Sequence, residues 1–209
     1  MGVADEVIPA VEVAAWLGLA VQNVRRLIRS GELEGRRVGR DWVVDRRSVL
    51  RYRDLRPGRG RPLSARQAWA TLLAAEPRTV EEVRVLAVSC RRRAARRPAR
   101  VLPALLSEML GHEGIVQGGA AVFDAPSELF RQQAYVRDDD LGSLRREFRI
   151  DVTGADPNVL LRVVPHVDWP FNESDRIVPQ VVGLVDLVDE REERWVRDSL
   201  AEMRRGRAV

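Results

Sequence analysis

The sequence contains no lysine, one cysteine and two histidines, so several kinds of chemistry have few residues available. Cys90 alone excludes a disulfide within the chain and favours a reducing compartment, so we expect a cytoplasmic protein. His112 and His166 lie far apart, and neither has the spacing of a metal-ligand pair. Because the sequence also lacks nucleotide-binding glycine loops and nucleophile–base signatures, we expect a protein that is not an enzyme and needs no cofactor or metal.

Long hydrophobic runs are missing as well. No run of 18 apolar residues occurs, so no transmembrane helix is expected. The first residues lack the basic and apolar regions of a secretory signal, so none is expected. Hydrophobic residues still make up 45% of the 209 residues. That content is enough for one large domain or for two to three small ones with buried cores.

Positive charge comes from arginine alone and is unevenly distributed. The 35 basic and 31 acidic residues give a net charge of +4. Residues 1–62 carry +5 (13 arginines, 8 acidic residues), residues 63–105 carry +6 (9 and 3), and residues 106–209 carry −7 (13 and 20). The basic front half favours binding to a polyanion, whereas the acidic back half suits a protein partner or self-assembly.

A two-helix pattern lies near the start of the chain. Apolar residues recur at helical spacing in two short runs, near 11–17 and 21–30. Gly18 separates the runs and suits a tight turn between two helices that meet at a steep angle. In the hairpin pattern of residues 35–44, Val38, Trp42 and Val44 share one side and are expected to face the core. A helix near 46–53 would close the domain.

These residues resemble the excisionase-type, MerR-like winged helix-turn-helix. In that family a Leu-Gly pair closes the first helix, Gly-Glu-Leu ends the recognition helix, and Gly-Arg-Asp-Trp lies in a β wing. The matching residues are Leu17-Gly18, Gly31-Glu32-Leu33 and Gly39-Arg40-Asp41-Trp42. The resemblance covers about the first quarter of the chain and implies binding to double-stranded DNA. Ala20 replaces the family's usual Ser or Thr N-cap, which costs about 1 kcal/mol.

Polar side chains occupy the positions that the apolar face of the second helix leaves free. Gln22, Asn23 and Arg26 are the candidates for base-edge contacts, because amide and guanidinium groups form paired hydrogen bonds with bases. Arg25 and Arg29 are candidates for contacts with either bases or phosphates. The pattern is typical of a helix that enters the major groove.

Further arginines extend this candidate DNA-binding surface. Arg36, Arg37 and Arg40 in the wing would contact the DNA backbone or the neighbouring minor groove. Residues 56–63 have the composition of a linker, and within it Arg59-Gly60-Arg61-Pro62 resembles the core of an AT-hook. Arg59 and Arg61 would run along the floor of a narrow minor groove. The alternative is a flexible basic tether.

The middle of the chain is predicted to be helical. Ser64 and Gln67 fit a capping box for a helix that extends to about residue 75. Thr79 and Glu82 fit another, for a helix that extends to about residue 97 and has Cys90 on its apolar stripe. A third helix is expected near 101–110.

Six arginines lie at and just beyond the predicted end of the second of these helices: Arg91, Arg92, Arg93, Arg96, Arg97 and Arg100. One interpretation is a solvated helix end whose cations complement the helix dipole. The other is a second patch that contacts phosphates beside the winged domain.

The back half mixes both kinds of secondary structure. Strands are expected at 115–123, 149–152 and 159–164, and a short helix at 139–148. Two helices, near 178–189 and 191–205, end the chain. The pattern predicts an α+β domain.

Four segments resemble actinobacterial proteins related to AbiEi-type antitoxins. They are residues 60–69 (Gly-Arg-Pro-Leu-Ser-Ala-Arg-Gln-Ala-Trp), 159–165 (Val-Leu-Leu-Arg-Val-Val-Pro), 169–171 (Trp-Pro-Phe) and 178–188 (Val-Pro-Gln-Val-Val-Gly-Leu-Val-Asp-Leu-Val). The resemblance implies an autorepressing antitoxin encoded beside a nucleotidyltransferase-like toxin. The same short apolar segments also fit core packing. In those relatives the DNA-binding part is not usually excisionase-like, so the chain departs from their arrangement.

Asp138, Asp139 and Asp140 are the candidates for a divalent-metal site, which two-metal nucleic-acid chemistry would require. The Gly-Ser turn and Asp-x-Asp strand of a nucleotidyltransferase are both missing. Three aspartates before a helical pattern favour an N-terminal cap and an anionic first turn instead.

The sequence therefore predicts an α+β protein with four segments: a winged helix-turn-helix domain (1–55), an AT-hook-like linker (56–63), a helical segment (64–112), and an α+β partner-binding or assembly domain (113–209). We expect a nucleoid-associated, sequence-specific regulator of transcription that is the autorepressing antitoxin of a toxin–antitoxin pair. Its expected partners are double-stranded DNA, a nucleotidyltransferase-like toxin bound by the acidic half, and a second copy, since one small winged domain covers only a short site. The alternatives are an excisionase-type recombination directionality factor and a DNA-targeted, metal-dependent enzyme.

Overall fold

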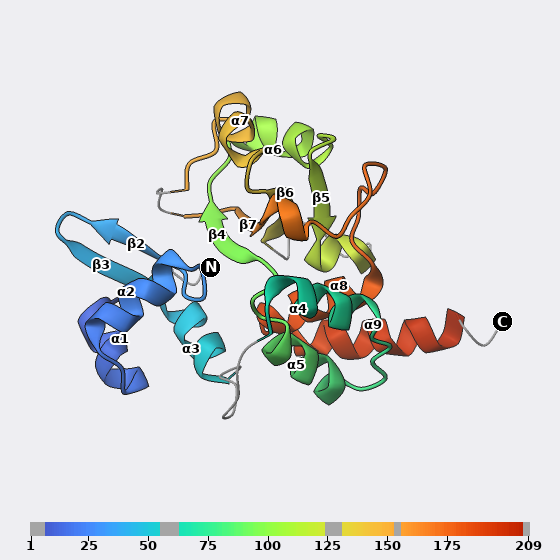
Figure 1. The fold of residues 1–209 in the computed structure, drawn as a ribbon, viewed down its shortest axis with the longest axis horizontal. Coiled ribbons are helices and arrows are strands. Elements are labelled where there is room, and N and C mark those ends of the chain that lie inside the picture. Colours follow the sequence, from blue (N-terminus) through green and yellow to red (C-terminus); the bar gives the residue numbers. More distant parts are fainter. Residues whose placement is uncertain (1–6, 55–62, 124–130, 153–155, 207–209) are drawn as a thin grey trace.

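A computed structural model describes residues 7–54, 63–123, 131–152 and 156–206 of the chain. They form a small winged domain, residues 7–54, beside a larger body, residues 63–206 (Figure 1). The body combines helices with a four-stranded sheet, which confirms the expected α+β class. Within the described residues, no helix is long and apolar enough to span a membrane.

The winged domain combines three helices with a three-stranded antiparallel sheet in the order β1-β3-β2. Its elements are β1 (Val7–Pro9), α1 (Ala10–Leu17), α2 (Val21–Arg29), β2 (Gly35–Val38), β3 (Asp41–Asp45) and α3 (Arg46–Asp54). Gly18 ends α1 with a φ of 64°, a left-handed conformation that favours glycine. The three predicted helices and the hairpin are thereby confirmed.

The core of the winged domain is made by the apolar faces of its helices. Val13, Val24, Leu33, Val44 and Val49 are almost completely buried in it. Val38 was expected to face this core, but its side chain is exposed. The prediction was wrong because the hairpin register pairs Val38 with Asp41 and Arg37 with Trp42. Val38 therefore lies on the face of the sheet opposite to Trp42 and Val44, next to the exposed turn of the hairpin.

The body is built on a mixed sheet in the order β4-β7-β6-β5. The strands are β4 (Ala95–Ala99), β5 (Ile115–Gly118), β6 (Gln132–Arg137) and β7 (Val159–Val164). The central strands β6 and β7 are parallel, and the chain between them includes α7 (Leu141–Glu147), as a parallel crossover requires. Both outer strands are antiparallel to their neighbours.

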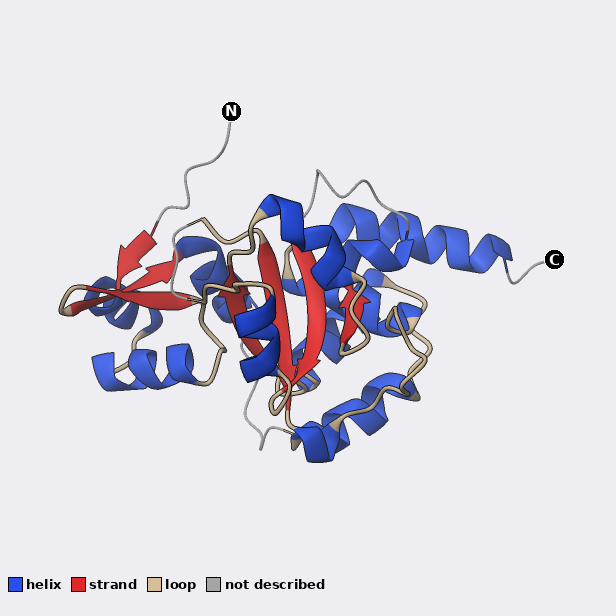
Figure 2. Cartoon of the chain, turned by 90° about the horizontal axis from the view of Figure 1, so that it is seen from above, coloured by secondary structure: helices blue, strands red, loops and turns tan. Residues whose placement is uncertain are grey.

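Alternating side chains on these strands divide the body into two cores. Ala134 and Val136 face the core that α7 and α6 (Pro103–Leu110) cover. Tyr135 faces the opposite core, which four helices cover: α4 (Ala65–Leu73), α5 (Val80–Ser89), α8 (Gln180–Asp189) and α9 (Glu193–Gly206). The sheet therefore lies between two helical layers (Figure 2).

The predicted secondary structure differs from the observed one in four places. The helix predicted over 79–97 ends at Ser89, and residues 95–99 instead form β4. The strand predicted at 149–152 is only an isolated bridge between Arg100 and Asp151. Strand β6 was not predicted at all, and residues 119–123 of the predicted strand 115–123 form a 3₁₀ helix, η1 (Gly119–Phe123).

The helical segment predicted at 64–112 contributes directly to the structure of the body. Its strand β4 pairs with β7 at five positions. Trp69 from α4 makes edge-to-face contacts with Tyr135 and Phe171, with ring centroids 5.7 and 5.3 Å apart. Residues on both sides of position 112 thus share one sheet and one core.

Candidate nucleic-acid interface and domain junction

The second helix of the winged domain has one apolar face and one polar face. Val24, Leu27 and Ile28 are buried against the domain core. The side chains of four of the five candidates for DNA contacts are exposed, and that of Asn23 is half-buried; the exposed ones are Gln22, Arg25, Arg26 and Arg29. The N-cap residue of the helix is Ala20, which provides no side-chain hydrogen bond, as the sequence predicted. An exposed face rich in amide and guanidinium groups suits base edges and phosphates.

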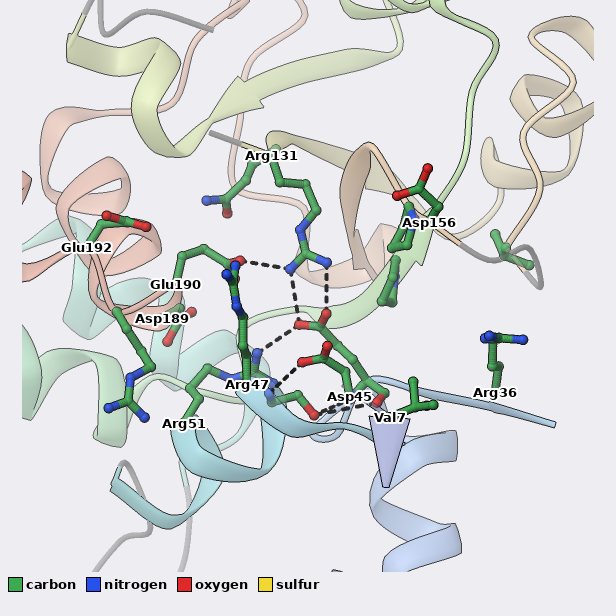
Figure 3. A pocket seen from close by; sticks show the side chains of 18 of the residues that line it. Val7, Arg36, Asp45, Arg47, Arg51, Arg131, Asp156, Asp189, Glu190 and Glu192 are labelled. Carbon is green, nitrogen blue, oxygen red and sulfur yellow. Dashed lines mark hydrogen bonds and ion pairs between the residues drawn. The ribbon is translucent and has the colours of Figure 1, made fainter. Parts of the chain in front are cut away.

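The wing places its three candidate arginines differently. Arg37 and Arg40 are exposed near the hairpin tip, whereas Arg36 is half-buried and lines a cavity between the winged domain and the body. Arg36 lies apart from the charged cluster of that cavity (Figure 3). Arg59 and Arg61, with the AT-hook-like segment, lie outside the described residues.

Glu34 is the central residue of the contact between the two domains. It follows α2 in the sequence, and its carboxylate is 96% buried. Oε1 accepts hydrogen bonds from Arg51 Nη1 of α3 at 2.8 Å and from Arg96 Nη2 of β4 at 2.6 Å. Oε2 accepts one from Arg131 Nη1, just before β6, at 2.9 Å. One carboxylate of the winged domain is thus bound by two arginines of the body.

Glu190, at the end of α8, completes this arrangement. Its carboxylate accepts a hydrogen bond from Arg131 Nη2 at 2.7 Å (Figure 3). It also pairs with Arg96. We call Glu34, Arg51, Arg96, Arg131 and Glu190 the junction cluster. Its members come from both domains, so it fixes the winged domain in one orientation on the body.

The arginines of the junction cluster keep its two carboxyl groups ionised. Burial raises the pKa of Glu34, but the positive charges of Arg131, Arg96 and Arg51 outweigh burial and hold this pKa well below its ordinary value. Burial likewise raises the pKa of Glu190, and Arg131 and Arg96 reverse that effect, so its pKa is also lowered. Both carboxylates are therefore ionised at neutral pH and stabilise the junction as anions.

A second buried network lies directly behind the junction cluster, inside the body. Arg93 Nη2 donates hydrogen bonds to Asp186 and Asp189, both at 2.7 Å. Arg162 of β7 contacts the same two carboxylates at 3.1 and 3.0 Å. The Tyr135 hydroxyl donates to Asp186 at 2.7 Å. Burial of a charge is costly unless the charge is paired, and here each charge has partners of opposite sign.

These contacts correct the first interpretation of the arginine cluster at 91–100 and reduce the number of arginines open to the second. Helix α5 ends before Arg91, so the arginines are not the solvated end of a helix. Arg93 and Arg96 are buried ion-pair partners and are not available to phosphates. Arg91 pairs with Glu32, and Arg100 pairs with Asp156. Only Arg92 and Arg97 keep exposed or half-exposed side chains without a carboxylate partner among the described residues.

The aspartates at 138–140 have structural partners. Asp138 Oδ1 accepts hydrogen bonds from the backbone nitrogens of Asp139 and His166 at 3.1 and 2.8 Å. Asp140 is the N-cap residue of α7, although its side chain makes no capping hydrogen bond. Asp139 Oδ2 lies 3.2 Å from His166 Nδ1. The described part of the chain contains no group of three or more His, Cys, Asp or Glu residues that could hold a metal ion.

Comparison with protein families agrees with this geometry. Residues 10–54 match the family model described as a helix-turn-helix domain. The match spans α1, α2, the wing and α3. No curated protein and no solved structure matches the chain. The N-terminal part is therefore a DNA-binding domain of the helix-turn-helix class, which supports a DNA-binding regulatory role.

Proposed function

We propose that this protein is a sequence-specific regulator of transcription that binds double-stranded DNA through α2 in the major groove. The observation that carries the proposal is the exposed face of α2. This face lies opposite the buried apolar face of the helix and consists of polar side chains: Gln22, Arg25, Arg26 and Arg29. Gln22 and Arg26, with the half-buried Asn23, would contact base edges. Arg25 and Arg29 would contact bases or phosphates.

The wing is proposed to widen the footprint on DNA. Arg37 and Arg40 are exposed at the hairpin tip, where they would contact the backbone or the adjacent minor groove. One such domain covers a short site, so useful specificity requires a homodimer or several copies on repeated sites. The protein is proposed to act by binding, without catalysis of its own.

At a finer level, we propose that the protein is the autorepressing antitoxin of a toxin–antitoxin pair. The proposal rests on the resemblance of the body to AbiEi-type antitoxins. Segments that carry this resemblance contact one another in the fold: Trp69 packs on Phe171, and Arg162 pairs with Asp186 at 3.1 Å. These contacts support a common core, and the acidic back half of the chain, residues 106–209, is the proposed site for the toxin.

A reporter driven by the DNA upstream of the protein's own gene tests repression. The full chain should lower reporter expression, and a Gln22→Ala, Arg26→Ala double variant should restore it. A variant with Arg145→Ala, an exposed arginine of α7, is the matched control and should repress normally. Equal expression with and without the protein would contradict the regulatory role.

Neutralisation of an adjacent gene product tests the antitoxin role separately. A neighbouring toxin-like reading frame should arrest growth when it is expressed alone, and co-expression of this protein should restore growth. The Gln22→Ala, Arg26→Ala variant should still neutralise, because the toxin is proposed to bind the body. A neighbouring integrase, with loss of excision on deletion of this protein, would instead favour a recombination directionality factor.

A further inference from the structure

Strand β4 of the body lies directly against the C-terminal end of α2. Arg97 Nη2 donates a hydrogen bond to the carbonyl oxygen of Arg29, the last residue of α2, at 2.8 Å. The backbone at Gly31 approaches β4 so closely that a Cβ atom there would lie 2.5 Å from the backbone nitrogen of Arg96. The body therefore touches the helix that is proposed to enter the DNA.

Two body arginines beside this contact remain accessible. Neighbouring residues on β4 have different environments: Arg96 is buried in the junction cluster, whereas Arg97 is half-buried beside α2. Arg92, in the turn before β4, is exposed, and within the described residues its side chain makes no hydrogen bond or ion pair. A cavity of about 460 Å³ is lined by Arg92 together with Ser30 and Gly31, which places Arg92 near the end of α2.

The location of these arginines matters because of how a recognition helix docks. A helix in the major groove has a phosphate backbone on each side, and contacts to those phosphates orient the protein on the duplex. Positive side chains next to the end of the helix are therefore within reach of phosphates that flank the base contacts. The junction cluster holds β4, and with it Arg97, in this position.

We propose that Arg92 and Arg97 contact DNA phosphates, so that the DNA-binding surface continues from the winged domain onto the body. The proposal rests on the proposed DNA-binding function and adds a second domain to it. These contacts are independent of base sequence, because phosphates carry no sequence information directly. They contribute equally to binding of the upstream DNA and of a random duplex.

The salt dependence of DNA binding tests this proposal in the full-length protein. Affinities for a labelled duplex of the upstream DNA and for a random duplex are measured over a series of NaCl concentrations. The proteins are the wild type, Arg92→Ala, Arg97→Gln and Arg145→Ala. Arg145 is an exposed arginine of α7, which lies well away from α2 (Figure 1), and serves as the control. Melting temperatures verify that each variant is folded.

Each phosphate contact that is lost should reduce the slope of log K against log salt concentration by about 0.9. Arg92→Ala and Arg97→Gln should each show this reduction on both duplexes, whereas Arg145→Ala should keep the wild-type slope. A wild-type slope in Arg92→Ala would overturn the proposal, and so would an equal reduction in Arg145→Ala. A wild-type protein that binds neither duplex would instead overturn the proposed function itself.

Discussion

The carboxylate of Glu34, in the winged domain, accepts a 2.6 Å hydrogen bond from the guanidinium of Arg96, in the sheet of the body. Both side chains are more than nine-tenths buried. The contact joins the segment that follows α2 to β4, and Arg131 and Arg51 bind the same carboxylate. The orientation of the DNA-binding domain on the body therefore depends on one buried anion.

Replacing Glu34 tests the importance of this anion for stability. Glu34→Gln keeps the size of the side chain but leaves three arginines without a shared negative charge. Removing one partner from a buried ion pair costs about 3–5 kcal/mol, so we expect a loss of that order in the free energy of unfolding, measured by urea denaturation. Glu81→Gln is the control, because Glu81 is exposed and, among the residues that the structure describes, pairs with Arg84 alone across one helical turn. The loss of stability in this variant should stay below about 1 kcal/mol.

The same anions predict how stability depends on pH. The folded-state pKa values of Glu34 and Glu190 are lowered, so their contribution is complete above the unfolded-state pKa and is lost as the pH falls towards the folded-state values. Urea denaturation should show a steady loss of stability below about pH 4.3, the ordinary pKa of glutamic acid. Glu34→Gln should show a shallower loss. Identical pH profiles for the wild type and Glu34→Gln would contradict this account.

Two glycines with the same backbone conformation separate local strain from domain docking. Gly18 and Gly31 have φ angles of 64° and 75°, but a Cβ atom at Gly18 meets nothing within 4 Å, whereas one at Gly31 meets the Arg96 backbone. Gly18→Ala should cost about 1–2 kcal/mol for the left-handed conformation alone. Gly31→Ala should cost more and should also increase proteolytic cleavage between the two domains. Equal losses of stability and equal rates of proteolysis in the two variants would show that the close contact between Gly31 and β4 is not needed to dock the two domains.

Substitution of Arg26 tests the role of the recognition helix. If the Arg26 side chain forms paired hydrogen bonds with a guanine, Arg26→Ala should weaken binding to the cognate site by about 1–3 kcal/mol. Binding to random DNA should change much less. An equal loss on both DNAs, in fluorescence anisotropy titrations, would identify Arg26 as a phosphate contact instead.

The winged domain was predictable from sequence because its signals are local. The spacing of Val24, Leu27 and Ile28 defines the apolar face of α2, and the same spacing leaves Gln22 and Arg26 exposed. Only the face of Val38 was misjudged, because residue parity does not carry across the two-residue turn at 39–40, and the register places Val38 opposite Asp41. The amphipathic pattern thus identified both the fold of this domain and its candidate DNA-binding side chains.

The body was harder to predict because its arginines act over long sequence separations. In the sequence, residues 91–97 resemble a charged helix end. In the structure, Arg93 forms an ion pair with Asp186, 93 residues later, and Arg96 forms one with Glu34, 62 residues earlier. Pairing of β4 with β7 and these buried contacts outweigh the local preference for helix. The domain junction could not be anticipated either, because nothing near Glu34 in the sequence marks it as the partner of Arg96 and Arg131.

Gel-shift binding of the full-length protein to its own upstream DNA, with excess random competitor and at two salt concentrations, tests the central claim most directly. The account predicts tight binding that survives the competitor and weakens at higher salt, because base contacts add to phosphate contacts. Binding that the random competitor abolishes at both salt concentrations would contradict sequence-specific regulation, and would limit the basic surface to general affinity for DNA.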